Sequence, residues 1–274
     1  MPLLILVLVA LCCAAAVCAF TGAFTVRAWL LWAVGFFVGL ALLGFLLLLY
    51  LCKRVDQDVP QEDDDKFYRI VGNFVIGVAL PFLRIRIRKS GLEKVPTQGR
   101  FLLVCNHCND SDPIILLHCL RKSQLAFISK RENKTMFVIG PMMHKLLCQL
   151  INRENDREAL KTILTCIRIL KEDKASIAVF PEGGILSEDG KLHHFRPGVF
   201  KIAQKADVPI VVCVLKNTKD VVRNIKRLRG TSTELKVLEV IPAEELKGVT
   251  TVEIAHRCYD LMAAELGPDL IAED

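Results

Sequence analysis

Charged side chains are almost absent from the first 52 residues of this sequence. Pro2–Val26 carries none, Arg27 stands alone, and Ala28–Cys52 again carries none. A helix that spans a membrane needs about 20 predominantly apolar residues, so each uncharged stretch is long enough to cross a bilayer. We therefore expect two helices, over Leu3–Phe20 and Trp29–Leu51, joined by a short turn.

Lysine and arginine are also missing ahead of the first apolar stretch, where a secretory signal peptide normally carries positive charge. The small residues of Ala14–Ala19 would suit a cleavage site, so a cleaved signal peptide is the alternative. The missing charge favours a retained transmembrane hairpin over residues 1–54. Lys53 and Arg54 then place the rest of this integral membrane protein on the cytoplasmic side, because positive residues beside membrane helices favour that side.

Aromatic residues and grouped cysteines are also scarce. With only three tyrosines and two tryptophans, the chain has no basic and aromatic array of the kind that stacks on bases, so nucleic acid is not an expected partner. The eleven cysteines lie mainly inside apolar segments, as reduced core residues do. Cys105 and Cys108 flank a histidine, but no second pair completes a tetrahedral metal site.

A polar, acidic linker over residues 55–66 separates the hairpin from the remaining domain, residues 67–274. The apolar segment Ile70–Leu83 has 14 residues, too few to span a membrane, and basic side chains follow it up to Lys89. An apolar segment beside a basic cluster is typical of an interfacial element on anionic lipid, here residues 67–89. The alternative is a core helix followed by an edge strand, in which the residues of RIRIR point alternately inward and outward.

From residue 90 onward, strand and helix patterns alternate, which predicts an α/β fold with a mixed sheet flanked by helices and preceded by the transmembrane hairpin. The expected strands are Phe101–Cys105, Leu125–Ile128, Ser176–Phe180, Ile210–Leu215 and Leu235–Val240. The expected helices are Pro113–Arg121, Glu158–Lys171, Phe200–Ala206 and Val252–Leu266.

His107 and Asp112 follow the first of these strands, in the stretch NHCNDSD. Five residues apart, the two side chains would diverge on a regular helix or strand, so they meet only if the chain turns between them. Residues 109–111 are turn formers, and Asp112-Pro113 suits the start of a helix. A carboxylate under His107 would fix its tautomer and leave the other ring nitrogen free to accept a proton. The alternative is that Asp112 is only a helix cap and His107 only a turn residue.

Two downstream stretches carry residues suited to binding an anion. Arg153 follows an apolar run, and an arginine clamps phosphate through two hydrogen bonds. In VFPEGG, Glu182, Gly183 and Gly184 follow a strand directly, and a glycine-rich turn leaves backbone amides free to hold an anion. Together with the His–Asp pair, the sequence supplies a base, a phosphate clamp and an anion-binding loop.

These blocks resemble the 1-acylglycerol-3-phosphate acyltransferase family of glycerolipid acyltransferases. NHCNDSD is similar to the family's NHxxxxD block and FPEGG to its FPEG block, and residues 127–160 resemble its second block with Lys130, Gly140 and Arg153 in register. The sequence departs from the family where Gly184 and Ile185 replace a threonine or serine and an arginine. The missing arginine would need a substitute, and the candidates are Arg157, Lys191, Arg196 and Lys216.

The resemblance implies an enzyme of phospholipid biosynthesis that moves a fatty acyl group to the 2-hydroxyl of 1-acylglycerol 3-phosphate, giving phosphatidic acid. It implies His107 and Asp112 as catalytic residues. It implies substrate-binding roles for the following residues: Lys130, Arg153, Glu182, Gly183 and Gly184. The expected partners are a lysophospholipid acceptor, an acyl-CoA or acyl-carrier-protein donor and membrane lipid. No metal or other cofactor is expected.

Three other functions stay open. The acceptor could be another lysophospholipid or lipid, within the same class of reaction. A lipid hydrolase could use His107 with Cys108 as nucleophile, although adjacent residues on a turn usually diverge. An inactive lipid-binding protein is the third, and the intact pair of His107 and Asp112 argues against it.

Overall fold

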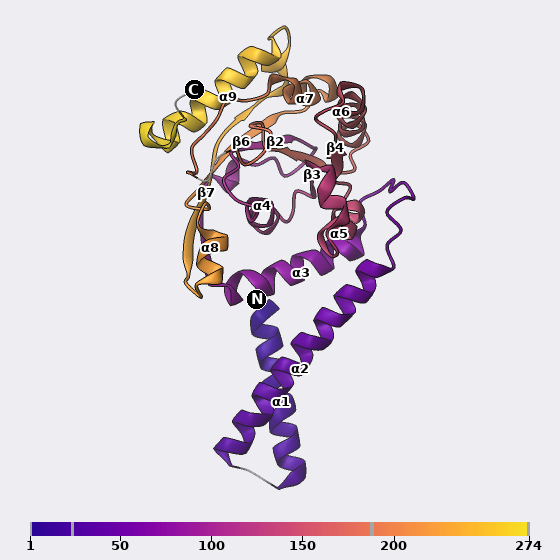
Figure 1. Ribbon diagram of the computed structural model, residues 1–274, viewed down its shortest axis with the longest axis vertical. Helices are drawn as coiled ribbons and strands as arrows, with labels where there is room; N and C mark the ends of the chain where they lie inside the picture. Colours follow the sequence, from indigo (N-terminus) through magenta and orange to yellow (C-terminus); the bar gives the residue numbers. More distant parts are fainter. Residues whose placement is uncertain (1, 23–24, 187–188, 273–274) are drawn as a thin grey trace.

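The computed structural model describes residues 2–22, 25–186 and 189–272, and it consists of a helical hairpin below an α/β domain (Figure 1). The hairpin helices are α1 (Pro2–Thr21) and α2 (Val26–Lys53), each slightly longer than the sequence predicts. Both are long and apolar enough to cross a membrane by length and composition, and most of their side chains are exposed. This is the arrangement that lipid, rather than a protein core, would cover.

The domain is a seven-stranded mixed sheet in the order β1-β7-β6-β2-β5-β3-β4, as the sequence predicts for the fold class. Neighbouring strands are parallel except β6 and β7. The strands are β1 (Ile85–Ser90), β2 (Leu102–Cys105), β3 (Leu125–Lys130), β4 (Gln149–Ile151), β5 (Ser176–Val179), β6 (Ile210–Lys216) and β7 (Thr231–Ile241). The helices are α3 (Lys66–Phe82), α4 (Asp112–Cys119), α5 (Ile139–Lys145), α6 (Asp156–Lys171), α7 (Lys201–Ala206), α8 (Val221–Lys226) and α9 (Thr251–Leu266).

Helices cover both faces of the sheet. On one face, Cys166 of α6, Ile202 of α7 and Met262 of α9 pack against the central strands. On the other, Ile115 and Leu116 of α4 pack against the same strands. Strands buried on both faces read as unbroken apolar runs, which is why β2, β5 and β6 are visible in the sequence.

The basic stretch after residue 83 is an edge strand of the sheet. β1 pairs only with β7, in parallel register, and Ile85 and Ile87 face the interior while Arg86 and Arg88 are exposed. Residues 85–90 therefore form the alternating edge strand of the alternative, and contact of residues 67–89 with lipid stays a prediction. An apolar residue at every second position is enough to bury one side of a strand.

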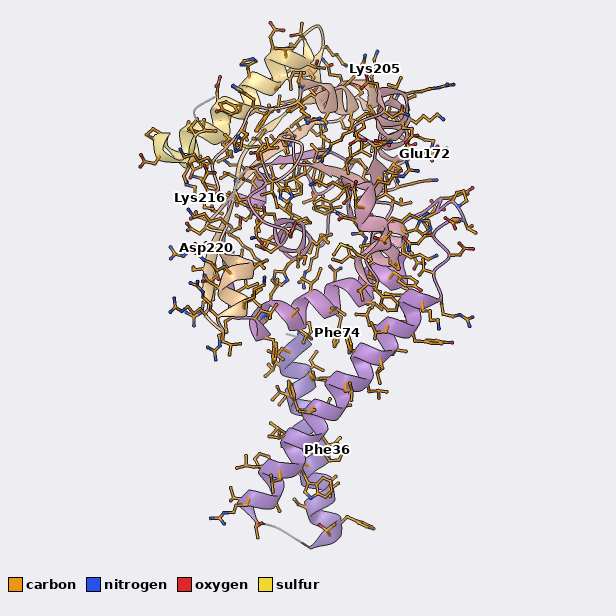
Figure 2. The ribbon with its side chains drawn as sticks, in the orientation of Figure 1. Phe36, Phe74, Glu172, Lys205, Lys216 and Asp220 are labelled. Carbon is orange, nitrogen blue, oxygen red and sulfur yellow. The ribbon has the colours of Figure 1, made fainter. Side chains whose placement is uncertain are left out.

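Helix α3 keeps the character of an interfacial helix. Its exposed apolar side chains include Phe67, Ile70, Phe74 and Phe82. It lies where the hairpin joins the domain, and Figure 2 shows Phe74 at this junction, above Phe36 of the hairpin. If Gly77 of α3 carried a side chain, its Cβ atom would lie only 2.8 Å from Cγ of Pro2. The start of α1 is therefore in close contact with α3. Lipid contact of α3 stays a prediction.

The acidic linker is bound to the domain along its length. Asp58 contacts Lys134 at 2.7 Å, and Asp63 contacts Lys174 at 3.4 Å. Asp64 contacts Arg69 of α3 at 2.6 Å, and this pair is the buried one, with side chains 4% and 9% exposed. The guanidinium of Arg69 also donates to the carbonyl of Leu125 on β3. The linker thus fixes α3, and with it the hairpin, against the sheet.

We expect Arg69→Met to lower the free energy of unfolding by about 3 kcal/mol, because removing one partner leaves the Asp64 carboxylate buried and unpaired. For a domain of this size, that loss corresponds to a thermal midpoint about 6–12 °C lower. The measurement is thermal unfolding of the detergent-solubilised chain. Arg131→Met is the matched control, because its ion pair with Glu158 is exposed and worth about 1 kcal/mol at most. Equal losses in the two variants would show that the Asp64–Arg69 pair does not hold the linker.

Candidate active site

The site begins where β2 ends, at the carboxyl edge of the parallel strands. The buried side chain of Asn106 accepts a hydrogen bond from the Leu215 amide at 2.8 Å and donates one to the Leu215 carbonyl at 2.9 Å. This exchange replaces the backbone pairing that β2 and β6 would otherwise continue. It fixes the point at which the chain leaves the sheet, one residue before His107.

His107 and Asp112 meet, as the sequence predicts. Nδ1 of His107 lies 3.0 Å from Oδ2 of Asp112. The same carboxylate oxygen accepts the amides of Cys108 and Asn109, at 2.7 and 2.8 Å, and the Asp112 side chain is fully buried. Three hydrogen bonds to one oxygen hold the turn closed and set the imidazole orientation. Within the described residues, Nε2 of His107 has no hydrogen-bond partner, so this nitrogen is available to take a proton.

Phe180 lies flat against the imidazole of His107. The ring centroids are 4.0 Å apart with an interplanar angle of 15°, and Phe127 stacks with Phe180 at a centroid distance of 6.0 Å. The stack restricts rotation of the His107 ring about its side-chain bond. The sequence reasoning did not assign Phe180 a role, although the residue stands directly before Pro181 and Glu182.

Glu182 is a clamp between two loops. Its Oε1 accepts the His107 amide at 2.7 Å and its Oε2 accepts the His193 amide at 3.0 Å. Burial raises the pKa of the Glu182 carboxyl to about 7, although both amide hydrogen bonds act in the opposite direction. These contacts are those of a residue that orders the loops, whereas a substrate-binding role for Glu182 stays a prediction.

The Gly183-Gly184 turn passes beneath three cationic side chains. A Cβ atom on Gly183, which has φ of 88°, would lie 2.6 Å from Nε of Arg196. A Cβ atom on Gly184 would lie 3.3 Å from Nη1 of Arg153 and 3.8 Å from Nζ of Lys130. Glycine is therefore required at position 183 both for its left-handed backbone and for this close approach. The Gly183 amide donates to the Phe180 carbonyl at 3.0 Å, which leaves Gly184 as the glycine whose amide could face an anion.

Lys130, Arg153 and Arg196 come from three separate segments: the end of β3, the loop after β4 and the loop before α7. Among the described residues, none of the three has an ion-pair partner. Burial and then the charge of Arg196 lower the pKa of Arg153, while Glu132 acts in the opposite direction. Cations held together without a bonded carboxylate suit a phosphate group.

Of the four candidate substitutes for the missing arginine, Arg196 is the one placed against the glycine turn. Lys216 is instead bound to Glu265 of α9, at 2.7 Å. Arg157 is exposed in the first turn of α6. Arg196 was hard to select from the sequence because it is separated from Gly183 by a loop of unpredictable path.

Cys108 is a poor nucleophile in this site. Burial, followed by the negative charges of Asp112 and Glu182, raises the pKa of its thiol to about 12. The thiolate is the reactive form, so Cys108 stays protonated at neutral pH. Its sulfur also contacts the side-chain amide of Asn106, away from the imidazole.

A family model described as Acyltransferase matches residues 86–216, a span that holds His107, Asp112, Glu182 and all three cations. Curated relatives agree with it. A Chlamydomonas reinhardtii protein named 1-acyl-sn-glycerol-3-phosphate acyltransferase is 29% identical over 215 residues, or 76% of this chain and 62% of the relative. Over residues 86–216, this chain is therefore similar to acyltransferases.

Other curated relatives show the same range of similarity. A Mycoplasma genitalium protein named probable 1-acyl-sn-glycerol-3-phosphate acyltransferase is 28% identical over 62% of each chain. A Salmonella typhimurium 1-acyl-sn-glycerol-3-phosphate acyltransferase is 26% identical, over 67% of this chain and 73% of the relative. The chain thus spans a little over three fifths of the length of the first two relatives.

The fold is shared with a solved acyltransferase. The crystal structure of the 1-acyl-sn-glycerophosphate acyltransferase PlsC from Thermotoga maritima aligns with a TM-score of 0.58 at 21% identity. The alignment covers 78% of this chain and 86% of that one, so it extends beyond the catalytic segment of the sheet.

We expect Glu182→Gln to remove part of the pH dependence of stability. The pKa of Glu182 is raised from 4.5 to about 7 in the folded protein. Between pH 4.5 and about 7, the folded chain therefore keeps a proton on Glu182 that the unfolded chain has lost. Stability therefore falls as pH rises through this window, by roughly 3 kcal/mol for this group, and the loss is complete above about pH 7. Unfolding of wild type and variant at about pH 5 and about pH 7.5 measures the difference. Glu172→Gln, on the surface, should match wild type, and a Glu182→Gln variant with the same pH dependence would contradict the prediction.

Proposed function

We propose that this protein transfers a fatty acyl group from acyl-CoA or acyl-carrier-protein to the 2-hydroxyl of 1-acylglycerol 3-phosphate, giving phosphatidic acid. One observation carries the proposal. The segment from Phe180 to Gly184 joins the His107–Asp112 pair to the three cations, through the ring stack at one end and the glycine turn at the other. The same segment thus contacts a residue that can take a proton and a cluster that can bind phosphate. This arrangement suits a substrate that carries both a hydroxyl and a phosphate.

In the mechanism, Nδ1 of His107 donates its hydrogen to Asp112, so Nε2 has the free lone pair. Nε2 takes the proton of the 2-hydroxyl as the oxygen attacks the thioester carbonyl carbon. The tetrahedral intermediate collapses, the C–S bond breaks, and the imidazolium returns the proton to the departing thiolate. Asp112 stabilises the imidazolium between these steps.

The cations hold the acceptor in place while His107 acts. Arg153 and Arg196 bind the phosphate, with Lys130 as a third positive charge and the Gly184 amide as a neutral donor. Glu182 orders the loop that carries His107 and does not contact the acceptor. The reaction as written needs no metal or other cofactor, because the thioester is already activated.

The membrane hairpin would bring the domain to its lipid substrate. We propose that the protein is integral, with its catalytic domain on the cytoplasmic side, where Lys53 and Arg54 end α2. A lysophospholipid acceptor and the phosphatidic acid product stay in the bilayer. The soluble thioester donor approaches from water.

The proposal is tested by a labelled-product assay in membranes that contain the full chain. Several lysophospholipids are offered against acyl-CoA and against acyl-carrier-protein. Labelled phosphatidic acid from 1-acylglycerol 3-phosphate is the expected product. Efficient use only of acceptors with larger head groups would reject this acceptor, and release of free fatty acid without transfer would indicate a hydrolase.

We expect His107→Ala to abolish transfer, since it removes the proton acceptor. Asp112→Asn should lower the turnover number by about 10²–10⁴-fold, because the amide keeps the shape of the turn but loses the charge that stabilises the imidazolium. Turnover is measured in membranes containing equal amounts of folded protein. Cys108→Ser is the control and should have a mild effect. Near-normal turnover of His107→Ala would remove it as the base, whereas a severe loss in Cys108→Ser would revive the thiol route.

We expect Arg153→Ala and Arg196→Ala each to raise the Michaelis constant for the lysophospholipid far more than that for the thioester. Loss of a charge-assisted contact costs about 1.5–3 kcal/mol, or roughly 10-fold to 150-fold in binding. Arg157→Ala, exposed on α6, is the matched control and should change neither constant. An equal effect on both substrates would assign the arginine to the fold or to the donor site instead.

A further inference from the structure

Six cationic side chains gather at one corner of the domain, formed by the start of β1, by α8 and by the turn after α8. We call these residues the cationic corner: Arg84, Arg86, Arg223, Lys226, Arg227 and Arg229. All six are exposed. The two segments are in contact, since the Arg84 carbonyl accepts the Thr231 amide and Nη1 of Arg84 donates to the Leu228 carbonyl at 3.4 Å.

Few negative charges offset this corner. Asp220 is ion-paired with Arg223 at 2.8 Å and neutralises one cation. Glu234 lies further along β7, opposite Arg88, beyond the corner itself. The other five cations therefore keep an excess of positive charge that an anionic surface could neutralise.

A groove of about 670 Å³ opens within the corner. One wall is Pro81, Arg84, Ile85 and Arg86, and the other is the backbone and side chains of residues 230–232. Two arginines and two hydroxyl-bearing residues, Thr231 and Ser232, are among the lining residues, and such hydrogen-bond donors suit phosphate oxygens.

Large apolar side chains stand among these charges. Leu228 is 83% exposed, between Arg227 and Arg229, and Phe82 at the end of α3 is 67% exposed. A cationic surface with apolar side chains at its centre is the pattern of a segment that lies in a membrane interface.

The corner lies at the membrane end of the domain. Val221 of α8 is buried against Leu80 of α3 and Ile85 of β1, which attaches α8 to the end of α3. α3 in turn contacts the start of α1 through Gly77 and Pro2. Figure 1 shows α8 beside the end of α3, close to where α1 begins, and Figure 2 shows Asp220 on this side with Lys205 at the opposite end of the domain.

We propose that the cationic corner docks on anionic phospholipid headgroups, with phosphate in the groove and Leu228 inserted among the upper acyl segments. A hairpin in the bilayer brings this corner to headgroup height, and its charge is complementary to anionic lipid. The docking would be a second membrane contact, on the far side of α3 from the acidic linker. It does not depend on the acyl transfer proposed above, because it involves none of the residues of that site.

The test places a single tryptophan at the tip of the corner. Trp29 and Trp32 are the chain's two tryptophans, so Leu228→Trp is made with Trp29→Phe and Trp32→Phe in the full chain. The protein is inserted into nanodiscs of phosphatidylcholine, with or without phosphatidylglycerol, whose acyl chains carry bromine near the headgroup. We expect Trp emission to shift to the blue and to be quenched strongly only with phosphatidylglycerol.

A charge-reversed variant identifies the cause. Arg227→Glu with Arg229→Glu should lower the docked fraction relative to the free one by about 25-fold or more, since each cation near an anionic surface contributes about fivefold. Lys226→Glu alone, on the same surface, should give a loss of about fivefold or more. Lys201→Glu with Lys205→Glu makes the same charge change at the far end of the domain and should have no effect on quenching.

Three results would overturn the proposal. Quenching that is equal with and without phosphatidylglycerol would mean that Leu228 inserts but the cations do not select anionic lipid. Quenching that persists in Arg227→Glu with Arg229→Glu would mean the same. A tryptophan signal that responds to soluble RNA at equal ionic strength, and not to phosphatidylglycerol, would assign the corner to a nucleic-acid partner.

Discussion

One buried carboxylate organises the loop on which the chemistry depends. Asp112 gathers the Nδ1 hydrogen of His107 and two backbone amides onto a single oxygen of a fully buried side chain. Hydrogen bonds to an ionised group are roughly twice as strong as neutral ones, so this oxygen can close a turn that has no regular secondary structure. His107 is then held by the same contact that would stabilise its charged form.

Glu182 is the second acid that holds this loop, and it accepts hydrogen bonds from backbone amides. It holds the His107 amide and the His193 amide, so the segments after β2 and before α7 share one acid. The two glycines that follow Glu182 lie against the cations, Gly183 against Arg196, and Gly184 against Arg153 and Lys130. The same short segment thus holds an acid that shapes the loops and a turn beside cations that are left for a ligand.

The residues of the central strands could be predicted because burial on both faces leaves unbroken apolar runs. The contact between His107 and Asp112 could be predicted because turn-forming residues lie between them. Other features left no such pattern. Phe180 reads as an ordinary core residue, and the three residues of β4 are too few to show a period. Arg196 reaches Gly183 through a loop whose path depends on Glu182, a contact between residues distant in sequence. The RIRIR stretch fitted two structures equally well, and pairing with β7 decided between them.

The charges on β1 also bear on how the sheet ends. The order of the strands leaves β1 and β4 at the two edges, each with a row of backbone groups that another chain could pair with. β4 offers only three residues, too short for a stable ladder. β1 is longer, but a second copy laid beside it would bring arginine against arginine. Repulsion between like charges therefore protects the open edge of this sheet from aggregation.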